Sequence, residues 1–417
     1  MSIYLKRLET LSSNLKHGHT AILFSGNAPK STADSHYGFR PDKNFFYLTG
    51  LRREGFILAV SSSNEVTLFI EKPDYDIEKW VGRKLTKEQA TKISGITDIK
   101  YLGEFETWFA NRVYSGKLRK LHLDLERMRW NDPTSEVECF AHEITKKYPA
   151  LRFKSLHPLM MDMRMYKSNE ELDEMRKAID LTHQGFLGVM KAAKPGVYEY
   201  ELEAEFAYRI RKGGADRTSF ETIVASGGDG VILHYVSNSK PVEDGNLVLL
   251  DFGAQYREYA ADISRTIPVN GKYSERQKVF YNIVLKAQED VLSIMKPGTP
   301  FEALNKKCQE SIANSLIEIG LIQSADELNR YYYHGCSHYL GLDVHDIGRR
   351  DIELKPGMVL TLEPGLYVAE EGIGIRIEDD ILITEDGYEN LSVAIPKSVE
   401  DIEAYMAQCR EHKCCRG

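Results

Sequence analysis

The 417-residue chain has few of the features that mark secreted, membrane-bound or nucleic-acid-binding proteins. Its six cysteines show no zinc-type spacing, so we expect free thiols in a reducing cytoplasm. Cys414-Cys415 is expected to belong to a disordered tail rather than to a metal site. No apolar run is long enough for a signal peptide or a membrane helix, and no membrane partner is expected. The net charge of −8 carries no block of one sign, which argues against a nucleic-acid partner.

The composition that remains is that of a globular chain with more than one domain. Apolar residues make up 42% and charged residues 28%, enough for a large core. Residues 1–157 are predicted to form an α/β domain with a mixed sheet flanked by helices near 2–16, 86–94 and 134–147. Its predicted strands are rich in β-branched and aromatic residues and lie at 20–25, 44–49, 56–60 and 66–70.

Residues 158–417 are predicted to form a second domain with an internal duplication, which makes the whole chain α+β. Lys194-Pro-Gly196 recurs at 296–298, and Asp251 aligns with Glu363 at an offset of 112. Capping boxes at Ser168 and Ser274 open long helices. Each half therefore consists of two helices followed by an acidic hairpin, and a pseudo-twofold axis would bring both hairpins to one centre.

Five residues of the type that binds metals lie on these hairpins and beside them. Asp251 and Asp262 bracket a turn centred on 255–258, which would place them directly opposite each other, and Glu363 and Glu378 bracket the turn at 369–372. His338 lies upstream of the second pair. The flanking residues are apolar, so the four carboxylates would be buried and would require cations. Four solvated acids and an unrelated histidine are the disfavoured alternative.

An oxygen-rich set of this kind suits two divalent ions, Mn, Co, Fe or Zn, and predicts metal-assisted hydrolysis. His234, His334 and His345 flank the carboxylates. Each alone is as consistent with a structural as with a catalytic role, but together they favour hydrogen bonding to a tetrahedral intermediate. Arg376 shares a strand face with Glu378, and would either pair with it or reach a substrate carboxylate.

Longer motifs carry a family resemblance. They are His234-Tyr-Val-Ser-Asn238, Leu250-Asp-Phe-Gly253, Ala261-Asp-Ile-Ser-Arg-Thr266, 334–346, Leu362-Glu-Pro-Gly-Leu-Tyr367 and Gly374-Ile-Arg-Ile-Glu-Asp-Asp380, with Phe45-Phe-Tyr-Leu-Thr-Gly50 and Trp80-Val-Gly-Arg83 in the amino-terminal part. With these motifs the chain resembles the Xaa-Pro aminopeptidases (aminopeptidase P) of the pita-bread metallopeptidase superfamily, over almost its whole length. Cys336, where the motif often has an apolar residue, is a small departure.

The resemblance implies roles for the site residues. Asp251, Asp262, His338, Glu363 and Glu378 would bind two metals, usually manganese, with Asp262 and Glu378 bridging them. A bridging hydroxide would attack the carbonyl before proline, and Glu363 would handle its proton. His234 and His345 would hydrogen-bond the substrate and the tetrahedral intermediate, while His334 and Arg376 would line the site.

The resemblance also bears on assembly and leaves alternatives open. A homodimer or homotetramer is implied, in which Trp80 would close a neighbour's site; a tryptophan buried in its own core is the alternative. Prolidase, which cuts only Xaa-Pro dipeptides, is the second candidate activity. An inactive binding module on the same fold is disfavoured because all five ligands are present. Since Arg376 is expected to be occupied by Glu378, we expect cleavage of Xaa-Pro-Xaa tripeptides and longer peptides.

Overall fold

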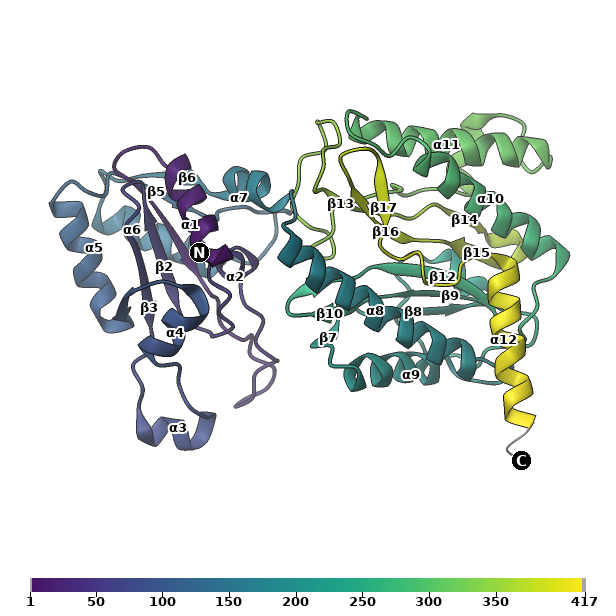
Figure 1. Cartoon of the computed structure of the whole chain (residues 1–417), viewed down its shortest axis with the longest axis horizontal. Coiled ribbons are helices and arrows are strands. Elements are labelled where there is room, and N and C mark those ends of the chain that lie inside the picture. The colour runs from purple at the N-terminus through teal and green to yellow at the C-terminus, as the bar shows by residue number, and fades with distance from the viewer. Residues whose placement is uncertain (1, 415–417) are drawn as a thin grey trace. The chain divides into compact units, whose positions relative to one another are not determined.

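The computed structural model describes residues 2–414, with the side chains of 412–414 excepted, and Cys414-Cys415 therefore lies outside what can be compared. The chain forms two compact units, Met1–Met163 and Arg164–Gly417 (Figure 1). The division falls six residues beyond the expected end of the first domain at residue 157, because helix α7 (His157–Arg164) packs on the first unit. Tyr47 donates a hydrogen bond to the carbonyl of Met163, and Met160 is fully buried.

The first unit is built on a mixed six-stranded sheet with the order β4-β3-β2-β1-β5-β6. Its strands are β1 (His19–Phe24), β2 (Ile57–Ser61), β3 (Val66–Ile70), β4 (Asp98–Tyr101), β5 (Lys120–Leu123) and β6 (Arg152–Ser155). The helices are α1 (Ile3–Asn14), α2 (Lys43–Thr49), α3 (Tyr75–Val81), α4 (Lys87–Ser94), α5 (Phe105–Tyr114) and α6 (Glu136–Lys147), with the short 3-10 helix η1 (Leu102–Glu104). Strands β1, β2 and β3 pair antiparallel, whereas β3–β4, β1–β5 and β5–β6 pair parallel.

One predicted strand of this unit is a helix. Residues 44–49 were expected to be extended, but α2 begins after Asp42, whose side chain accepts a hydrogen bond from the Phe45 backbone N–H. The helix ends at Gly50, which has the left-handed conformation (φ 69°). All residues from Asn44 to Thr49 are buried, so the helix lacks the polar face that would have produced a 3.6-residue period.

Helix α3 contributes nothing to the core of the unit. None of its residues is buried, and Trp80 is 90% exposed. The alternative that Trp80 is buried in the core of its own domain is therefore wrong. The helix is held by local interactions instead, since Asp74 caps its amino end.

The second unit has the predicted internal duplication, since each half begins with two helices and continues with a set of strands. The first half has α8 (Asn169–Ala192), α9 (Glu199–Lys212), β7 (Arg217–Thr218), β8 (Ile223–Ser226), η2 (Gly227–Val231), β9 (Leu247–Phe252), β10 (Ala254–Tyr256), β11 (Tyr259–Ala260) and β12 (Ile263–Pro268). The second half has α10 (Glu275–Leu292), α11 (Phe301–Glu318), η3 (Ala325–Arg330), β13 (Val359–Leu362), β14 (Gly365–Val368), η4 (Ala369–Glu371), β15 (Ile373–Arg376), β16 (Asp379–Ile383) and β17 (Tyr388–Asn390), and α12 (Val399–Cys414) follows.

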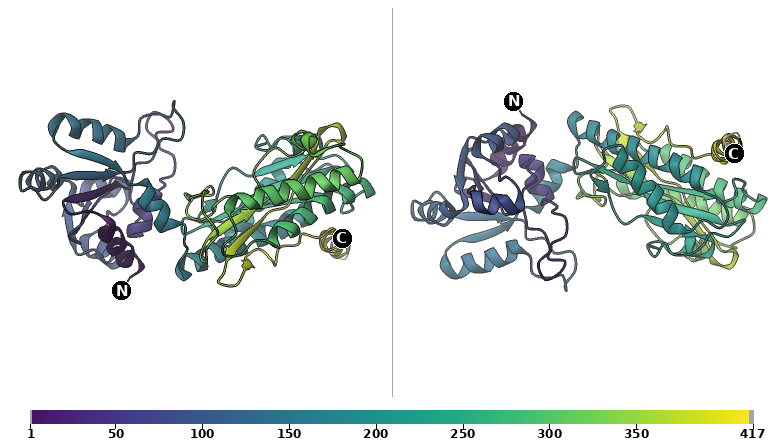
Figure 2. Two further views of the ribbon diagram at one scale, coloured as in Figure 1. Left: turned by 90° about the horizontal axis from the view of Figure 1, so that it is seen from above. Right: turned by 90° about the horizontal axis from the view of Figure 1, so that it is seen from below.

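The two halves are joined along their strands and covered by their helix pairs. Figure 2 shows α10 and α11 in front of the strands when seen from above, and α8 and α9 in front when seen from below. The Glu378 backbone N–H donates to the Ser264 carbonyl (3.0 Å), which links β12 to the start of β16. The strands therefore lie between the two helix pairs, and the acidic hairpins meet there.

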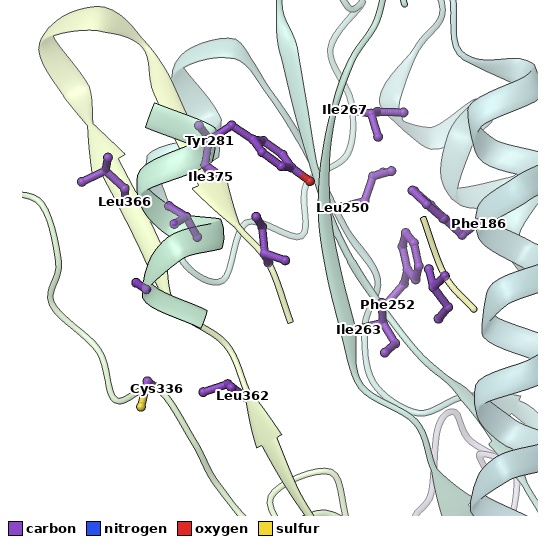
Figure 3. Packing of buried hydrophobic residues seen from close by; sticks show 14 of the residues in the cluster. Phe186, Leu250, Phe252, Ile263, Ile267, Tyr281, Cys336, Leu362, Leu366 and Ile375 are labelled. Atoms are coloured by element: carbon purple, nitrogen blue, oxygen red, sulfur yellow. The ribbon is translucent and has the colours of Figure 1, made fainter. Parts of the chain in front are cut away.

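Apolar side chains from both halves form one core beneath the hairpins. Figure 3 shows Phe186, Leu250, Phe252 and Ile263 packing on the side of the first half, and Tyr281, Leu362, Leu366 and Ile375 on the side of the second. This core keeps the backbone of both hairpins rigid, so polar side chains on their other face have fixed positions.

Two further observations concern thiols and helix length. The cysteines described in full, Cys139, Cys308, Cys336 and Cys409, are free thiols. Among residues 2–414, helices that combine the length and the apolar character needed to cross a bilayer are absent.

Candidate metal centre

The first acidic hairpin places its two aspartates on one face, but not opposite each other. Asp251 pairs with Ser264, and Asp262 lies two residues before Ser264, directly ahead of the first residue of β12. The prediction of direct opposition is wrong because the turn is centred one residue later, on Arg257 and Glu258, both with positive φ (47° and 71°). Neither residue type favours a two-residue turn of this kind, so the sequence carried no signal for it.

The second acidic hairpin has the predicted register. Leu362 pairs with Asp379, and Gly365 pairs with Arg376, so the same register passes through the interruption at Pro364. Glu363 therefore faces Glu378. Gly372 has the left-handed conformation (φ 63°) at the end of the turn, a signal that can be recognised in the sequence.

The two hairpins and the loop that carries His338 converge on one buried cluster. Ligand atoms of Asp262, His338 and Glu378 all lie within 4.8 Å of one another. His338 Nε2 is 3.5 Å from Asp262 Oδ2 and 3.4 Å from Glu363 Oε1. Asp251 joins this group because the Ser264 hydroxyl lies 2.9 Å from Asp251 Oδ1 and 2.9 Å from Glu378 Oε2. The structure thus brings together all five residues that the sequence singled out.

The carboxylates of this cluster lack enough positive charge. Burial raises the pKa of Asp262, and the acids around it, Asp251 first, raise that pKa further. Burial also raises the pKa of Glu363 and of Glu378, and for Glu378 the next cause is Asp262. Within residues 2–414, Glu378 Oε1 is buried without a hydrogen-bond partner. A set of four converging carboxylates and one imidazole, with an unsatisfied buried oxygen, fits divalent cations.

His338 has the tautomer of a metal ligand. Its Nδ1 lies 3.0 Å from the Tyr339 carbonyl oxygen, which can only accept, so Nδ1–H donates and Nε2 turns its lone pair toward the carboxylates. Burial is the main cause that lowers the pKa of His338 to about 4, which keeps the ring neutral. A neutral imidazole held by its second nitrogen is the form that binds divalent metals.

The other three histidines surround the carboxylate cluster. The His345 ring meets the His338 ring edge-on, with centroids 4.5 Å apart. His334 donates from Nδ1 to the Gly335 carbonyl (2.8 Å) and accepts at Nε2 from the Tyr367 hydroxyl (2.8 Å). Burial lowers the pKa of His334 to about 4 and also lowers that of His345. His234 is exposed on the loop after η2.

Arg376 has a different partner from the one expected. Its Nη2 contacts Asp251 Oδ2 at 2.7 Å, its Nε donates to the Ser264 hydroxyl at 2.7 Å, and Nη1 donates to the Tyr367 hydroxyl at 3.2 Å. The expectation that Glu378 occupies it is wrong. Glu378 lies two residues along the chain from Arg376, whereas Asp251 lies across the junction between the two halves, which period-two alternation within one strand cannot reveal.

Sequence reasoning missed three polar residues that support the cluster. Ser264 lies two residues after Asp262 and therefore on the same strand face, a signal that alternation could have supplied. The Tyr367 hydroxyl links His334 with Arg376. Asp380 is fully buried and accepts a hydrogen bond from the Asp262 backbone N–H (3.3 Å). The contacts of Tyr367 with His334 and of Asp380 with Asp262 join segments far apart in the chain, so local patterns do not predict them.

The comparisons with known proteins define the class to which this fold and site belong. The family model of metallopeptidase family M24 matches residues 173–385, and the model of the aminopeptidase P amino-terminal domain matches residues 4–121. The chain belongs to metallopeptidase family M24 and has the pita-bread fold, with both of these domains.

Within that class the chain is similar to Xaa-Pro aminopeptidases over nearly its full length. It is 34% identical to the Xaa-Pro aminopeptidase of Escherichia coli, with 98% of each chain covered. A solved structure from Bacillus anthracis, assigned as an aminopeptidase P, shares 44% identity and a TM-score of 0.95, with 97% of this chain and 98% of that chain covered. The Escherichia coli enzyme in complex with the inhibitor Pro-Leu gives a TM-score of 0.89 at 34% identity, with 99% of each chain covered.

Proposed function

We propose that this protein is a metallo-aminopeptidase that removes the amino-terminal residue from peptides with proline in second position. The observation that carries the proposal is the convergence of two aspartates, two glutamates and a histidine on one cluster, in which Glu378 Oε1 is buried with no hydrogen-bond partner among the residues that the structure describes. The full-length similarity to Xaa-Pro aminopeptidases supplies the substrate class.

Asp251, Asp262, His338, Glu363 and Glu378 would hold two divalent ions, with Asp262 and Glu378 between them. Bound ions of this kind polarise a substrate carbonyl and lower the pKa of a water molecule toward neutrality. The oxygen-rich donor set favours manganese, with cobalt, zinc or iron as alternatives. A zinc-substituted Escherichia coli aminopeptidase P has been solved in complex with product, which supports some tolerance of the metal within this class.

The remaining residues would carry protons and hydrogen bonds. Glu363, whose Oε1 lies 3.4 Å from His338 Nε2 in the cluster, would carry a proton from the attacking water to the departing amine. His345 and His234 would donate to the substrate carbonyl as it becomes tetrahedral. His334, fixed by Gly335 and Tyr367, would form a wall of the site.

The contacts of Arg376 favour longer peptides over dipeptides. A dipeptidase must bind the carboxylate directly after proline, and a guanidinium that already donates to Asp251, Ser264 and Tyr367 is a weak trap for it. The test compares Ala-Pro, Ala-Pro-Ala and Ala-Ala-Ala under added manganese, each followed by release of alanine. We expect turnover of Ala-Pro-Ala alone or above Ala-Pro. Turnover of Ala-Pro with none of Ala-Pro-Ala would make the protein a prolidase, and equal turnover of Ala-Ala-Ala would reject both activities.

Helix α3 supports a proposal about assembly. Tyr75 is 77%, Trp80 90% and Val81 65% exposed, on a helix held at its amino end by a single cap. Large exposed apolar groups of this kind mark contact surfaces. We infer that α3 packs against a neighbouring copy in a homodimer or homotetramer, where Trp80 closes the neighbour's site.

Free thiols are consistent with a reducing compartment, which we infer to be the cytoplasm.

A further inference from the structure

A buried carboxylate outside the metal cluster organises the loop that carries His234. Glu199 opens helix α9 and is fully buried. Its Oε1 accepts hydrogen bonds from the backbone N–H of Ser226 (2.9 Å) and from the Ser226 hydroxyl (2.7 Å). Its Oε2 accepts from the Tyr235 hydroxyl (2.9 Å) and from the backbone N–H of Lys240 (3.0 Å). All four donors lie at 226–240, on both sides of His234.

The same loop is closed by further contacts at its ends. The Glu199 backbone N–H donates to the Lys240 carbonyl (3.0 Å), and Lys240 forms an ion pair with Asp229 (2.5 Å). At the start of the loop, Gly230 lies so close to strand β15 that a Cβ on Gly374 would come within 1.9 Å of the Gly230 carbonyl oxygen. The loop is therefore fixed against the strand that carries Arg376.

Tyr235 connects the buried Glu199 carboxylate with the adjacent residue His234. Along 232–236 the chain alternates, with Tyr235 buried and Ile232, His234 and Val236 exposed. The Tyr235 ring packs in a small apolar cluster with Leu249 and Tyr367, and its hydroxyl reaches Glu199. His234 lies in the turn directly before Tyr235. Because Tyr235 is held inward by its ring and its hydroxyl, the backbone from which the exposed His234 side chain extends has a fixed position.

We infer that Glu199 is a positioning residue, which acts through Tyr235 to hold His234 where the substrate carbonyl binds. The inference rests on the proposed function, in which His234 donates to that carbonyl. Glu199 itself is not among the residues of the metal cluster, so its effect on the reaction must pass through the loop. The inference assigns it a contribution to rate beyond its contribution to folding.

The geometry explains why only a carboxylate serves here. Each of its two oxygens meets one backbone N–H, that of Ser226 or that of Lys240, and a backbone donor cannot turn away. An amide in either orientation would set its NH₂ group against one of these donors. Glu199→Gln therefore loses contact with one end of the loop although it preserves shape.

The experiment is a comparison of single and double variants with Ala-Pro-Ala as substrate, with metal content and melting temperature measured for each. Tyr235→Phe and Ser226→Ala each remove one hydroxyl donor from Glu199, but only Tyr235 adjoins His234. We expect Tyr235→Phe to lower kcat/KM roughly tenfold and Ser226→Ala to lower it by about twofold or less, because small displacements of a donor are costly in rate. Metal content should remain that of the parent protein in both.

The decisive comparison is made in the His234→Ala background. If Glu199 acts through His234, Glu199→Gln and Tyr235→Phe lower kcat/KM in the parent protein but not in His234→Ala. An equal fold-loss in both backgrounds, or equal effects of Tyr235→Phe and Ser226→Ala, would overturn the inference and leave Glu199 a structural residue. Full activity of His234→Ala would instead remove His234 from the proposed function. If Glu199→Gln does not fold, the cycle of Tyr235→Phe with His234→Ala gives the same answer.

Discussion

At the scale of single residues, the cluster makes Asp262 the most exacting position. Asp262→Asn replaces a carboxylate that is proposed to bridge two ions with an amide, which is a poor bridging ligand. We expect turnover to fall below detection and the metal content to drop. In the metal-free protein the same change removes one of several buried like charges, so we expect it to raise the melting temperature by about 2–4 °C, the shift that about 1 kcal/mol produces in a domain of this size. Activity of Asp262→Asn close to that of the parent protein would contradict the assignment.

His345 and His338 lie side by side, but we expect their substitution by alanine to have different effects on metal content and on rate. His345→Ala should retain the metals and lose about 10²–10³-fold in kcat, the usual effect of removing one transition-state donor. His338→Ala is the matched control and should lose metal, because its Nε2 faces Asp262 and Glu363. Elemental analysis and steady-state rates of the two variants separate the roles. Loss of metal in His345→Ala would show that its role is assigned wrongly.

In the first unit, His122 predicts the response to acid. Its Nε2 lies 2.9 Å from His19 Nδ1 and it is 2% exposed. Burial first, then His19, Lys154 and Lys120, lower the pKa of His122 to about 4. As the pH falls, the His122 imidazole therefore binds a proton in the unfolded chain before it does so in the folded chain. The first unit keeps this contribution to its stability in full above pH 6.5 and loses it as the pH falls from there to about 4.

We expect this titration to remove about 2–3 kcal/mol from the free energy of unfolding of the first unit, in proportion to the change in pKa. Chemical denaturation of the full chain at pH 7, 5.5 and 4.5, followed by the fluorescence of Trp108 and the other tryptophans, measures it. His122→Gln cannot titrate and should flatten the dependence. An equally steep loss in His122→Gln would assign the acid sensitivity to other groups.

At the scale of elements, a substitution in helix α3 tests whether this helix closes the site of a neighbouring copy. Because Trp80 is 90% exposed, Trp80→Ala should leave the melting temperature nearly unchanged, whereas a core tryptophan would cost about 3–5 kcal/mol. If α3 closes a neighbour's site, the variant should raise the Michaelis constant. Tyr114→Ala, which removes a side chain 96% exposed on α5, is the control. An unchanged Michaelis constant, together with an unchanged assembly state in light scattering, would exclude the lid.

The elements also show which parts of the fold the sequence could predict. Helices α8 and α10 begin at their predicted capping boxes, because a serine followed by glutamate or glutamine three residues later is a local device. The second hairpin has the predicted register since Gly372 marks its turn. The first does not, because Arg257 and Glu258 adopt left-handed conformations that their residue types do not announce. Their side chains are instead held by Glu174 and Arg217, from distant elements.

The candidate site divides in the same way. Its five metal-type residues could be found from the sequence, because acids in apolar strands stand out against their surroundings. The partner of Arg376 and the roles of Tyr367 and Glu199 could not. Each depends on side chains that meet across the junction of the two halves or across a loop, and no periodicity links residues so far apart in the chain.

At the scale of the whole molecule, metal removal should act on one unit only. The candidate ligands all lie in Arg164–Gly417, and binding to the folded state alone stabilises it by mass action, about 2.7 kcal/mol at a hundredfold excess over Kd. We therefore expect a chelator to abolish hydrolysis and to lower one of two calorimetric transitions, that of the second unit, with recovery on adding Mn²⁺. Sodium chloride at matched ionic strength is the control. Full activity in protein shown by elemental analysis to be metal-free would reject the centre.

The division of the acidic residues between the two halves has a consequence for how the centre can be assembled. The first half supplies Asp251 and Asp262, and the second supplies His338, Glu363 and Glu378, so neither can complete the centre alone. A chain cut in the connection between Pro268 and Glu275 would turn an intramolecular arrangement into a bimolecular one. Fragments 1–271 and 272–417 would then behave as a two-component system, silent when separate, with hydrolysis that rises with the product of their concentrations when mixed.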